Sequence, residues 1–347
     1  MPAAPLRRKA ITALMLVTLA LAATLVPLPA VAVERYFSQG LYPRIQAIVT
    51  PASNLLPVGV ADVVIGILLI VIGVGFLRMR RSQGWKHAAT TSALNVIMLA
   101  AVGQLLFLGV WGLHYRRVPL EQKLDFDRSY VTDANALALA AEAVRRLNAL
   151  HATAHSTAFD SDRLATAFAE AQRAMGFARE TRVGRPKHSL LGLYVEKAAF
   201  SGVAEPVFLE VVLHPRLLPI QKPRVLAHEW AHLAGFADES EASFLEWMAC
   251  LRGDPLAQYS GWMSAYSLAA SAVPARGRVT LPRLDPGPRQ DYRDVAAVYR
   301  GSSRMISIAA RSTYDSYLKA NRVSEGMANY DAVLKLMLGT TLGRDWR

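Results

Sequence analysis

The hydrophobic and polar positions divide the chain into an apolar first third and a mixed remainder. Three long apolar runs occupy about residues 10–33, 58–77 and 88–113, and the only charged residue within them is Asp62. At 1.5 Å per helical residue, each run is long enough to cross a hydrocarbon core of about 30 Å. A water-soluble helix of this length would carry a charged face. The pattern therefore predicts three N-terminal transmembrane helices within a membrane region spanning residues 1–117.

Positive charges beside these runs predict how the helices are oriented. Residues 7–9 are basic and precede the first run, and residues 78–86, between the second and third runs, contain four more basic residues. Basic loops stay on the cytoplasmic side of a membrane. We therefore expect a cytoplasmic N-terminus and an extracytoplasmic location for everything after the third run. Arg116 and Arg117 favour the opposite orientation but are outnumbered.

Two details of the apolar runs have alternative explanations. The sequence PAVAVE at the end of the first run resembles a cleavage site, but the run exceeds the 7–15 residues of a signal-peptide core, so we expect a retained anchor. Asp62 and Gln104 could mark an intramembrane function. The simpler interpretations are an interfacial position for Asp62 and a hydrogen bond between helices for Gln104.

The chain has a net charge of +12, and nine of these charges lie in residues 1–118, around the apolar runs. The rest of the chain is nearly neutral and has no basic stripe, so we expect no nucleic-acid partner. The expected partners are the lipid bilayer and a peptide or protein substrate. The single cysteine, Cys250, excludes an internal disulfide and is expected in the apolar core.

Residues 118–347 have the pattern of a folded domain. Apolar residues recur every three or four positions in 131–151 and 159–177, which predicts two helices, and Pro223 opens a further helical pattern. Further helical patterns continue to the C-terminus.

Between these helical segments, two runs at 190–200 and 205–215 favour β-strands, with a hairpin turn expected at Ser201-Gly202. The predicted fold class is therefore α+β, mostly α. Residues 207–212 could form an edge strand that pairs with an extended substrate, or an ordinary core strand.

The helix opened by Pro223 contains the motif H-E-x-x-H. His228 and His232 are four residues apart, so both imidazoles lie on one helical face and can bind one Zn²⁺. In such motifs the Glu, here Glu229, is a general base, because Zn²⁺ lowers the pKa of a bound water toward about 7. An amphipathic helix with two incidental histidines is the alternative. The acidic residues that follow favour the metal site.

Three acidic residues after Gly235 could supply the third zinc ligand. The sequence D-E-S-E at 238–241 fits a capping box in which Asp238 is the N-cap and Glu241 reaches back. Glu239 has no such local role. We therefore expect Glu239 to be the ligand, with Glu241 and then Asp238 as alternatives.

A second pair of histidines has the same spacing. His151 and His155 lack the intervening Glu, lie near a predicted helix end and precede no acidic cluster, so we expect polar surface there. The sequence contains no G-x-S-x-G, P-loop or G-x-G-x-x-G motif. A nucleophilic serine or a nucleotide site is therefore not expected.

The segment E-S-E-A-S at 239–243 resembles the E-x-x-A-[D/N] helix of gluzincins, the group that includes thermolysin and the CAAX prenyl proteases. The resemblance implies that Glu239 binds zinc and that Ser243 supports a ligand histidine. Ser243 departs from the acidic residue usual there and would be a weaker partner.

The chain also resembles a bacterial membrane family known as domain of unknown function 3810. The resemblance covers the membrane segments, HEWAHLAGFADESEASFLEWMAC at 228–250 and YDSYLKANRVSEGMANYDAV at 314–333. It implies a gluzincin-like domain with no settled substrate. For a bacterial protein, the predicted orientation corresponds to the inner (cytoplasmic) membrane with residues 118–347 in the periplasm.

These features together predict a membrane-anchored zinc metallopeptidase whose transmembrane helices precede a zincin-like (gluzincin) domain. Zn²⁺ would be bound by His228, His232 and Glu239, with Glu229 as general base. The main alternative is a non-catalytic zinc-binding sensor or scaffold, which would have no need of Glu229; a transporter accessory is a weaker one. Candidates for stabilising an oxyanion are Tyr314, Tyr317 and Tyr330.

Overall fold

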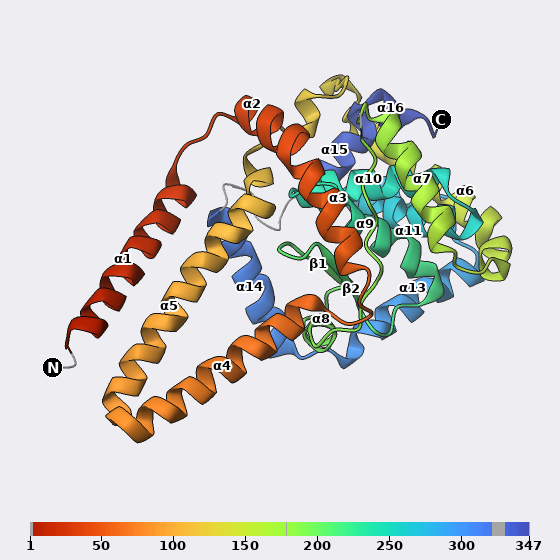
Figure 1. Ribbon diagram of the computed structural model, residues 1–347. Helices are drawn as coiled ribbons and strands as arrows, with labels where there is room; N and C mark the ends of the chain where they lie inside the picture. Colours follow the sequence, from red (N-terminus) through yellow and green to blue (C-terminus); the bar gives the residue numbers. More distant parts are fainter. Residues whose placement is uncertain (1–2, 178, 321–329, 347) are drawn as a thin grey trace.

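A computed structural model describes residues 3–177, 179–320 and 330–346. Three long apolar helices, α1 (Ala3–Leu25), α4 (Val60–Gln83) and α5 (Trp85–Val110), extend away from the remaining helices (Figure 1). All three are long and apolar enough to cross a membrane. Gln104 on α5 donates a hydrogen bond to the Thr24 hydroxyl on α1 at 3.1 Å, which confirms its expected role between helices.

The sequence predicted that the first apolar run would be one helix to residue 33, but the helix ends earlier. Helix α1 ends at Leu25, before Pro27 and Pro29, which lack the amide proton needed to continue a helix. Three further helical segments follow before α4: the short helix α2 (Ala30–Ala32), the π-helix η1 (Val33–Leu41) and α3 (Tyr42–Ser53).

Helices α4 and α5 are joined by Gly84 alone, which has a φ of 85°. The basic residues at 78–86 therefore lie on the last turns of α4 and the first turn of α5, at one end of the apolar hairpin. Asp62 lies in the first turn of α4, at the opposite end, where it accepts a hydrogen bond from the Leu190 amide at 2.8 Å.

The rest of the chain is mainly helical and surrounds one apolar core. Its helices are α6 (Asp133–Ser156), α7 (Ser161–Ala174), α8 (Leu191–Ala198), α9 (Lys222–Leu233), α10 (Glu239–Arg252), α11 (Pro255–Ala272), α12 (Ala275–Arg278), α13 (Pro286–Val298), α14 (Arg304–Ala320), α15 (Tyr330–Gly339) and α16 (Thr341–Arg344). Short 3₁₀ helices connect them: η2 (Gly112–Arg116), η3 (Leu120–Gln122), η4 (Arg128–Tyr130), η5 (Pro219–Gln221) and η6 (Tyr299–Gly301).

Helix α10 is central and packs against α7, α9, α11 and α15. Its apolar side chains are fully buried, including Phe244 and Trp247, and so is Cys250, as expected. Burying a large apolar side chain contributes roughly 1.5–3 kcal/mol. This packing fixes α10, and with it the position of α9, which lies against it.

The two strands are shorter than the sequence suggested. β1 (Gly202–Glu205) and β2 (Glu210–Leu213) pair antiparallel, with Gly202 opposite Leu213 and Glu205 opposite Glu210. The strand and turn predicted at 190–202 are wrong, because residues 191–198 form α8. A short apolar run does not distinguish a helix from a strand, and Val195 and Ala198 of this run are buried at helical spacing.

The hairpin turn instead occupies residues 206–209, and Leu209 has a φ of 52°. The Glu205 carboxylate accepts from the amides of Val207 at 3.1 Å and Phe208 at 2.6 Å, which stabilises the turn. The strand expected at 207–212 therefore begins only at Glu210.

Buried polar contacts attach the apolar helices to the core. The Glu210 carboxylate on β2 accepts from the first amides of α4, those of Val60 at 2.9 Å and Ala61 at 3.1 Å. The Lys187 ammonium lies 3.6 Å from Glu210 and donates to the carbonyls of Ser53, the last residue of α3, and Leu56. Arg116 donates to the last carbonyls of α1, including that of Thr24 at 2.6 Å. The start of α4 and the end of α1 are thus bound to the folded part.

Candidate metal centre

The motif H-E-x-x-H lies on α9, which begins near Pro223 as expected and ends at Leu233. Gly235 follows with a φ of 87°, and a Cβ there would lie 2.5 Å from the His114 ring, so both conformation and space require glycine. Asp238 then caps α10, as expected, by accepting from the amides of Ser240 at 2.9 Å and Glu241 at 3.2 Å. This short connection returns the start of α10 to the last turns of α9.

The turn brings Glu239 to the two histidines of the motif. The Nε2 atoms of His228 and His232 are 3.1 Å apart, and His228 Nε2 lies 3.1 Å from Glu239 Oε2. His232 Nε2 lies 3.6 Å from Glu239 Oε1. A tetrahedral zinc ion with bonds of about 2.0–2.2 Å needs donor atoms about 3.3–3.5 Å apart. The donor atoms lie close to this spacing, so the three side chains could hold a metal ion.

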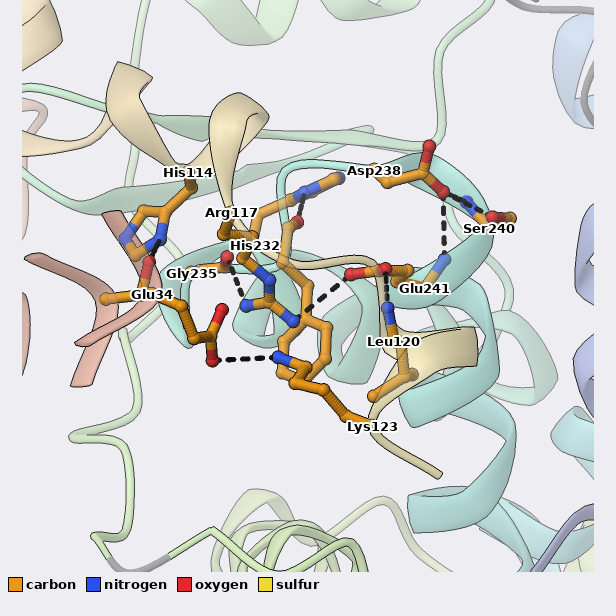
Figure 2. Close-up of polar contacts among 12 residues, drawn as sticks. Glu34, His114, Arg117, Leu120, Lys123, His232, Gly235, Asp238, Ser240 and Glu241 are labelled. Carbon is orange, nitrogen blue, oxygen red and sulfur yellow. Dashed lines mark hydrogen bonds and ion pairs between the residues drawn. The ribbon is translucent and has the colours of Figure 1, made fainter. Parts of the chain in front are cut away.

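The other two acidic candidates have different partners. Glu241 turns toward the segment after α5, where its carboxylate accepts from Arg117 Nη2 at 3.1 Å and from the Leu120 amide (Figure 2). It does not make the capping-box contact that the sequence suggested. Asp238 is occupied as the N-cap. Among the three acidic residues, only Glu239 lies with both histidines.

Polar contacts on the far side of each imidazole orient the histidines. His232 Nδ1 lies 2.7 Å from the carbonyl of Phe236. His228 Nδ1 lies 3.3 Å from the Ser243 hydroxyl and 3.5 Å from Glu246 Oε2. Such outer contacts fix the tautomer and direction of a metal-binding imidazole.

Sequence reasoning missed Glu246. Its side chain is 3% exposed, and Oε1 has no hydrogen-bond partner within the described part of the chain. Glu246 follows Glu239 by seven residues, so the two lie on one face of α10, two turns apart. It is also a lone charge in the apolar stretch 244–250. These two signals together could have identified it.

Glu229 is buried beside the hairpin. A Cβ on Gly202 would lie 2.6 Å from Glu229 Oε1, so glycine leaves room for the carboxylate in its present position against β1. The outer edge of β2 is bridged by Pro186, whereas the described residues form no third strand on the outer edge of β1. Among the described residues, the unpaired strand edge beside the motif is thus that of the half-buried β1 rather than that of the segment 207–212.

Burial and charge shift the pKa values of both acidic groups. Burial raises the pKa of Glu229, and the nearby His228 and His232 oppose this. Burial would also raise the pKa of Glu239, but the attraction of His232 and the hydrogen bonds from both histidines hold it well below its usual value. Glu239 is therefore an ionised carboxylate, the form that binds a metal ion.

Three side chains from the segments flanking the apolar helices bind the end of α9. Trp111 Nε1 donates to the carbonyl of His232 at 2.8 Å, and Tyr42 donates to that of Leu233 at 2.6 Å. Arg117 Nη1 donates to the carbonyl of Gly235 at 2.8 Å, as Figure 2 shows. These contacts cap carbonyls that the helix leaves unpaired. No local pattern reveals them, because their partners lie more than a hundred residues away.

The remaining sequence candidates lie elsewhere. His151 and His155 are on α6 and contact Asp291 of α13 rather than the residues of α9 and α10. The side chains of Tyr314, Tyr317 and Tyr330 lie outside the described residues.

One family model matches the chain, and it spans the whole metal centre. The family is described as a protein of unknown function (DUF3810), and the match covers residues 37–338. No curated protein and no solved structure matches the chain.

Proposed function

The chain belongs to the DUF3810 family of proteins of unknown function, and we propose that it is a membrane-anchored zinc metallopeptidase that hydrolyses peptide bonds. The observation that carries the proposal is the set of donor atoms on His228, His232 and Glu239, all within 3.1–3.6 Å, with the buried Glu229 on the same helix. Glu239 is 36% exposed at its side chain, which leaves one side of the site open for a substrate.

The proposed reaction uses Glu229 as a proton carrier. A Zn²⁺ bound to the three side chains would polarise the scissile carbonyl and lower the pKa of a nearby water. Glu229 takes one proton from that water as its oxygen attacks the carbonyl carbon. Glu229 then gives the proton to the amine nitrogen as the C–N bond breaks. Its burial supports this role, because a carboxyl group in an apolar site accepts a proton more readily.

The position of β1 supports a peptide as substrate. Gly202 brings the backbone of this strand against Glu229, and the outer edge of β1 could pair with an extended chain as a third strand. Main-chain pairing of this kind would present a backbone carbonyl beside the motif.

We also propose that the metal centre faces away from the cytoplasm, in the periplasm of a bacterial cell. The basic residues at 78–86 lie at the end of the α4–α5 hairpin that is farthest from the core, which supports a cytoplasmic position for that end (Figure 1). Arg116 and Arg117, which favour the opposite orientation, are themselves buried and contact the last carbonyls of α1 and the Glu241 carboxylate. Their positions are therefore accounted for by packing rather than by membrane orientation.

A non-catalytic zinc-binding sensor or scaffold is the second candidate. The observation that favours it is Ser243, which takes the place of the acidic residue usual in the gluzincin helix. In that case zinc would be bound, but replacement of Glu229 would have no consequence for any reaction.

The test is a Glu229→Gln variant of the full chain, purified in detergent. We expect it to keep its zinc and to lose hydrolysis of a quenched peptide library by about 10²–10⁴-fold, the usual contribution of a general base. Glu170→Gln, which changes an exposed glutamate on α7, is the matched control and should behave as the parent. Undiminished hydrolysis in Glu229→Gln would refute the catalytic role, and loss of zinc would identify Glu229 as a ligand.

A further inference from the structure

A second group of possible metal ligands lies between α6 and α13. His151 and His155 are one turn apart on α6, with ring centroids separated by 4.5 Å. Both Nε2 atoms point to the same oxygen, Asp291 Oδ2, at 3.5 Å for His151 and 3.0 Å for His155. The sequence separates Asp291 from His155 by 136 residues, so only the packing of α13 against α6 brings the carboxylate to the histidines.

The spacing of these donor atoms suits a small ion. The two Nε2–Oδ2 distances bracket the separation of about 3.3–3.5 Å that a tetrahedral ion with bonds near 2.0–2.2 Å requires. Two imidazoles and one carboxylate form a donor set typical of zinc and its neighbours in the first transition row, whereas calcium and magnesium prefer oxygen donors alone.

The carboxylate of this group is held in place by the core. Asp291 is 5% exposed, and the fully buried Tyr259 on α11 donates its hydroxyl to Oδ2 at 2.5 Å. Burial, together with the hydrogen bond and charge of Asp291, raises the pKa of Tyr259, so its hydroxyl remains a donor. A metal-binding carboxylate is commonly held by such an outer hydrogen bond.

The surroundings of the histidines also favour a site open to solvent. A Cβ on Gly287, in the first turn of α13, would lie 2.5 Å from the His151 ring, so glycine is what lets the imidazole lie against this helix. The side chains of His151 and His155 are 31% and 43% exposed. An ion can therefore enter from solvent, and water can complete its coordination.

A purely structural hydrogen-bond network explains only part of this arrangement. It accounts for the contacts of Tyr259 and His155 with Asp291, but His151 Nε2, at 3.5 Å, is too far for a good hydrogen bond. Binding of one ion between the three side chains would also give His151 a partner. We propose that His151, His155 and Asp291 form a second binding site for a divalent transition-metal ion of the Zn²⁺ class, which links α6 to α13.

This site shares no residue with the proposed catalytic centre. Figure 1 shows α6 and α13 on the side of the molecule away from α1, α4 and α5. The proposal therefore does not depend on peptidase activity. Its consequence is that the ion increases the free energy of unfolding, because a ligand that binds only the folded state stabilises it.

The experiment is zinc stoichiometry of the purified full chain at a buffered free zinc concentration. The parent should bind two ions per chain, and His155→Ala, His151→Ala and His228→Ala should each bind one. A double variant carrying His155→Ala and His228→Ala should bind none. The control is His188→Ala, an exposed histidine outside both groups, which should still bind two.

Cobalt provides a second readout that requires no activity. Titration of the His228→Ala variant with Co²⁺ should produce visible ligand-field bands, and adding His155→Ala should remove them while the helical content by circular dichroism stays the same. The proposal is overturned if His155→Ala binds as many zinc ions as the parent, or if His228→Ala alone leaves the chain with none. Failure at the catalytic centre would look different, because His228→Ala would then leave the stoichiometry unchanged.

Discussion

Replacing Glu246 should weaken zinc binding even though this residue is not among the proposed ligands. Its Oε2 lies 3.5 Å from His228 Nδ1, on the side of the imidazole opposite Glu239. A carboxylate there orients the ring and makes Nε2 a stronger donor toward a metal ion. Glu246→Gln keeps the shape of the side chain but removes its charge, so it tests this contribution without opening a cavity.

The structure allows the size of the effect to be worked out. Loss of an outer carboxylate typically costs 10–100-fold in metal affinity, or about 1.4–2.7 kcal/mol. Ser243 also contacts His228 Nδ1, at 3.3 Å, but through a neutral hydroxyl. A neutral hydrogen bond contributes about 1 kcal/mol, so Ser243→Ala should cost only about fivefold. Glu246 should therefore have the larger effect.

The assay is competition for zinc between each purified variant and a chromophoric chelator, with circular dichroism to check folding. A rescue variant sharpens the test. In the Glu246→Gln background, Ser243→Asp places a carboxylate next to His228 Nδ1 and should restore most of the lost affinity. The reasoning is refuted if Glu246→Gln binds zinc within twofold of the parent, or if Ser243→Ala is the more damaging change.

Three further predictions concern the metal ligands, the pH dependence of stability and the orientation in the membrane. Glu239→Gln should lose zinc, whereas Glu241→Gln should keep it. Glu241→Gln should instead lower the free energy of unfolding by about 3–5 kcal/mol, because the buried Arg117 loses its partner. The reverse pattern of zinc contents would contradict the ligand assignment. Burial, with the charges of Arg117 and Lys123, holds the pKa of His114 well below 6.5. Below about pH 6.5, His114 is therefore protonated in the unfolded chain but neutral in the folded one. Thermal stability should therefore fall as the pH drops below about 6.5, by up to about 1.4 kcal/mol per pH unit from this group, and His114→Phe should flatten that slope. A reporter that is active only outside the cytoplasm, fused after Arg347, should be active, and a silent but well-expressed fusion would contradict the proposed orientation.

The sequence alone determined the features that depend on neighbouring residues. Uninterrupted apolar composition identified the three long helices, because no other structure satisfies the backbone inside a bilayer so simply. The four-residue spacing of His228 and His232 fixed their common face, and Gly235 and Asp238 marked where one helix ends and the next begins. Each of these signals reflects geometry within one or two turns of the chain.

The tertiary structure decided which of several equivalent side chains meet. Glu239 and Glu241 are both acidic and two residues apart, and only the approach of Arg117, 124 residues away, shows that Glu241 belongs to the link with the apolar helices. Likewise, only the packing of α13 gives the histidines of α6 a carboxylate. Side chains on different elements meet according to how those elements pack. The spacing of hydrophobic residues within one element does not predict that packing.

The segment at 190–213 shows the same limit for the backbone. Its apolar residues fit a helix or a strand, and tertiary contacts decide between the two. Residues 191–198 form α8, in which Val195 is buried, whereas β2 pairs with β1 and is bridged by Pro186 on its other edge. Gly202 then lies against Glu229 because both strands of this hairpin pack against α9. The motif was visible in the sequence, but the strand beside it is a product of packing, because the free energy that selects a strand over a helix here comes from contacts distant in the chain.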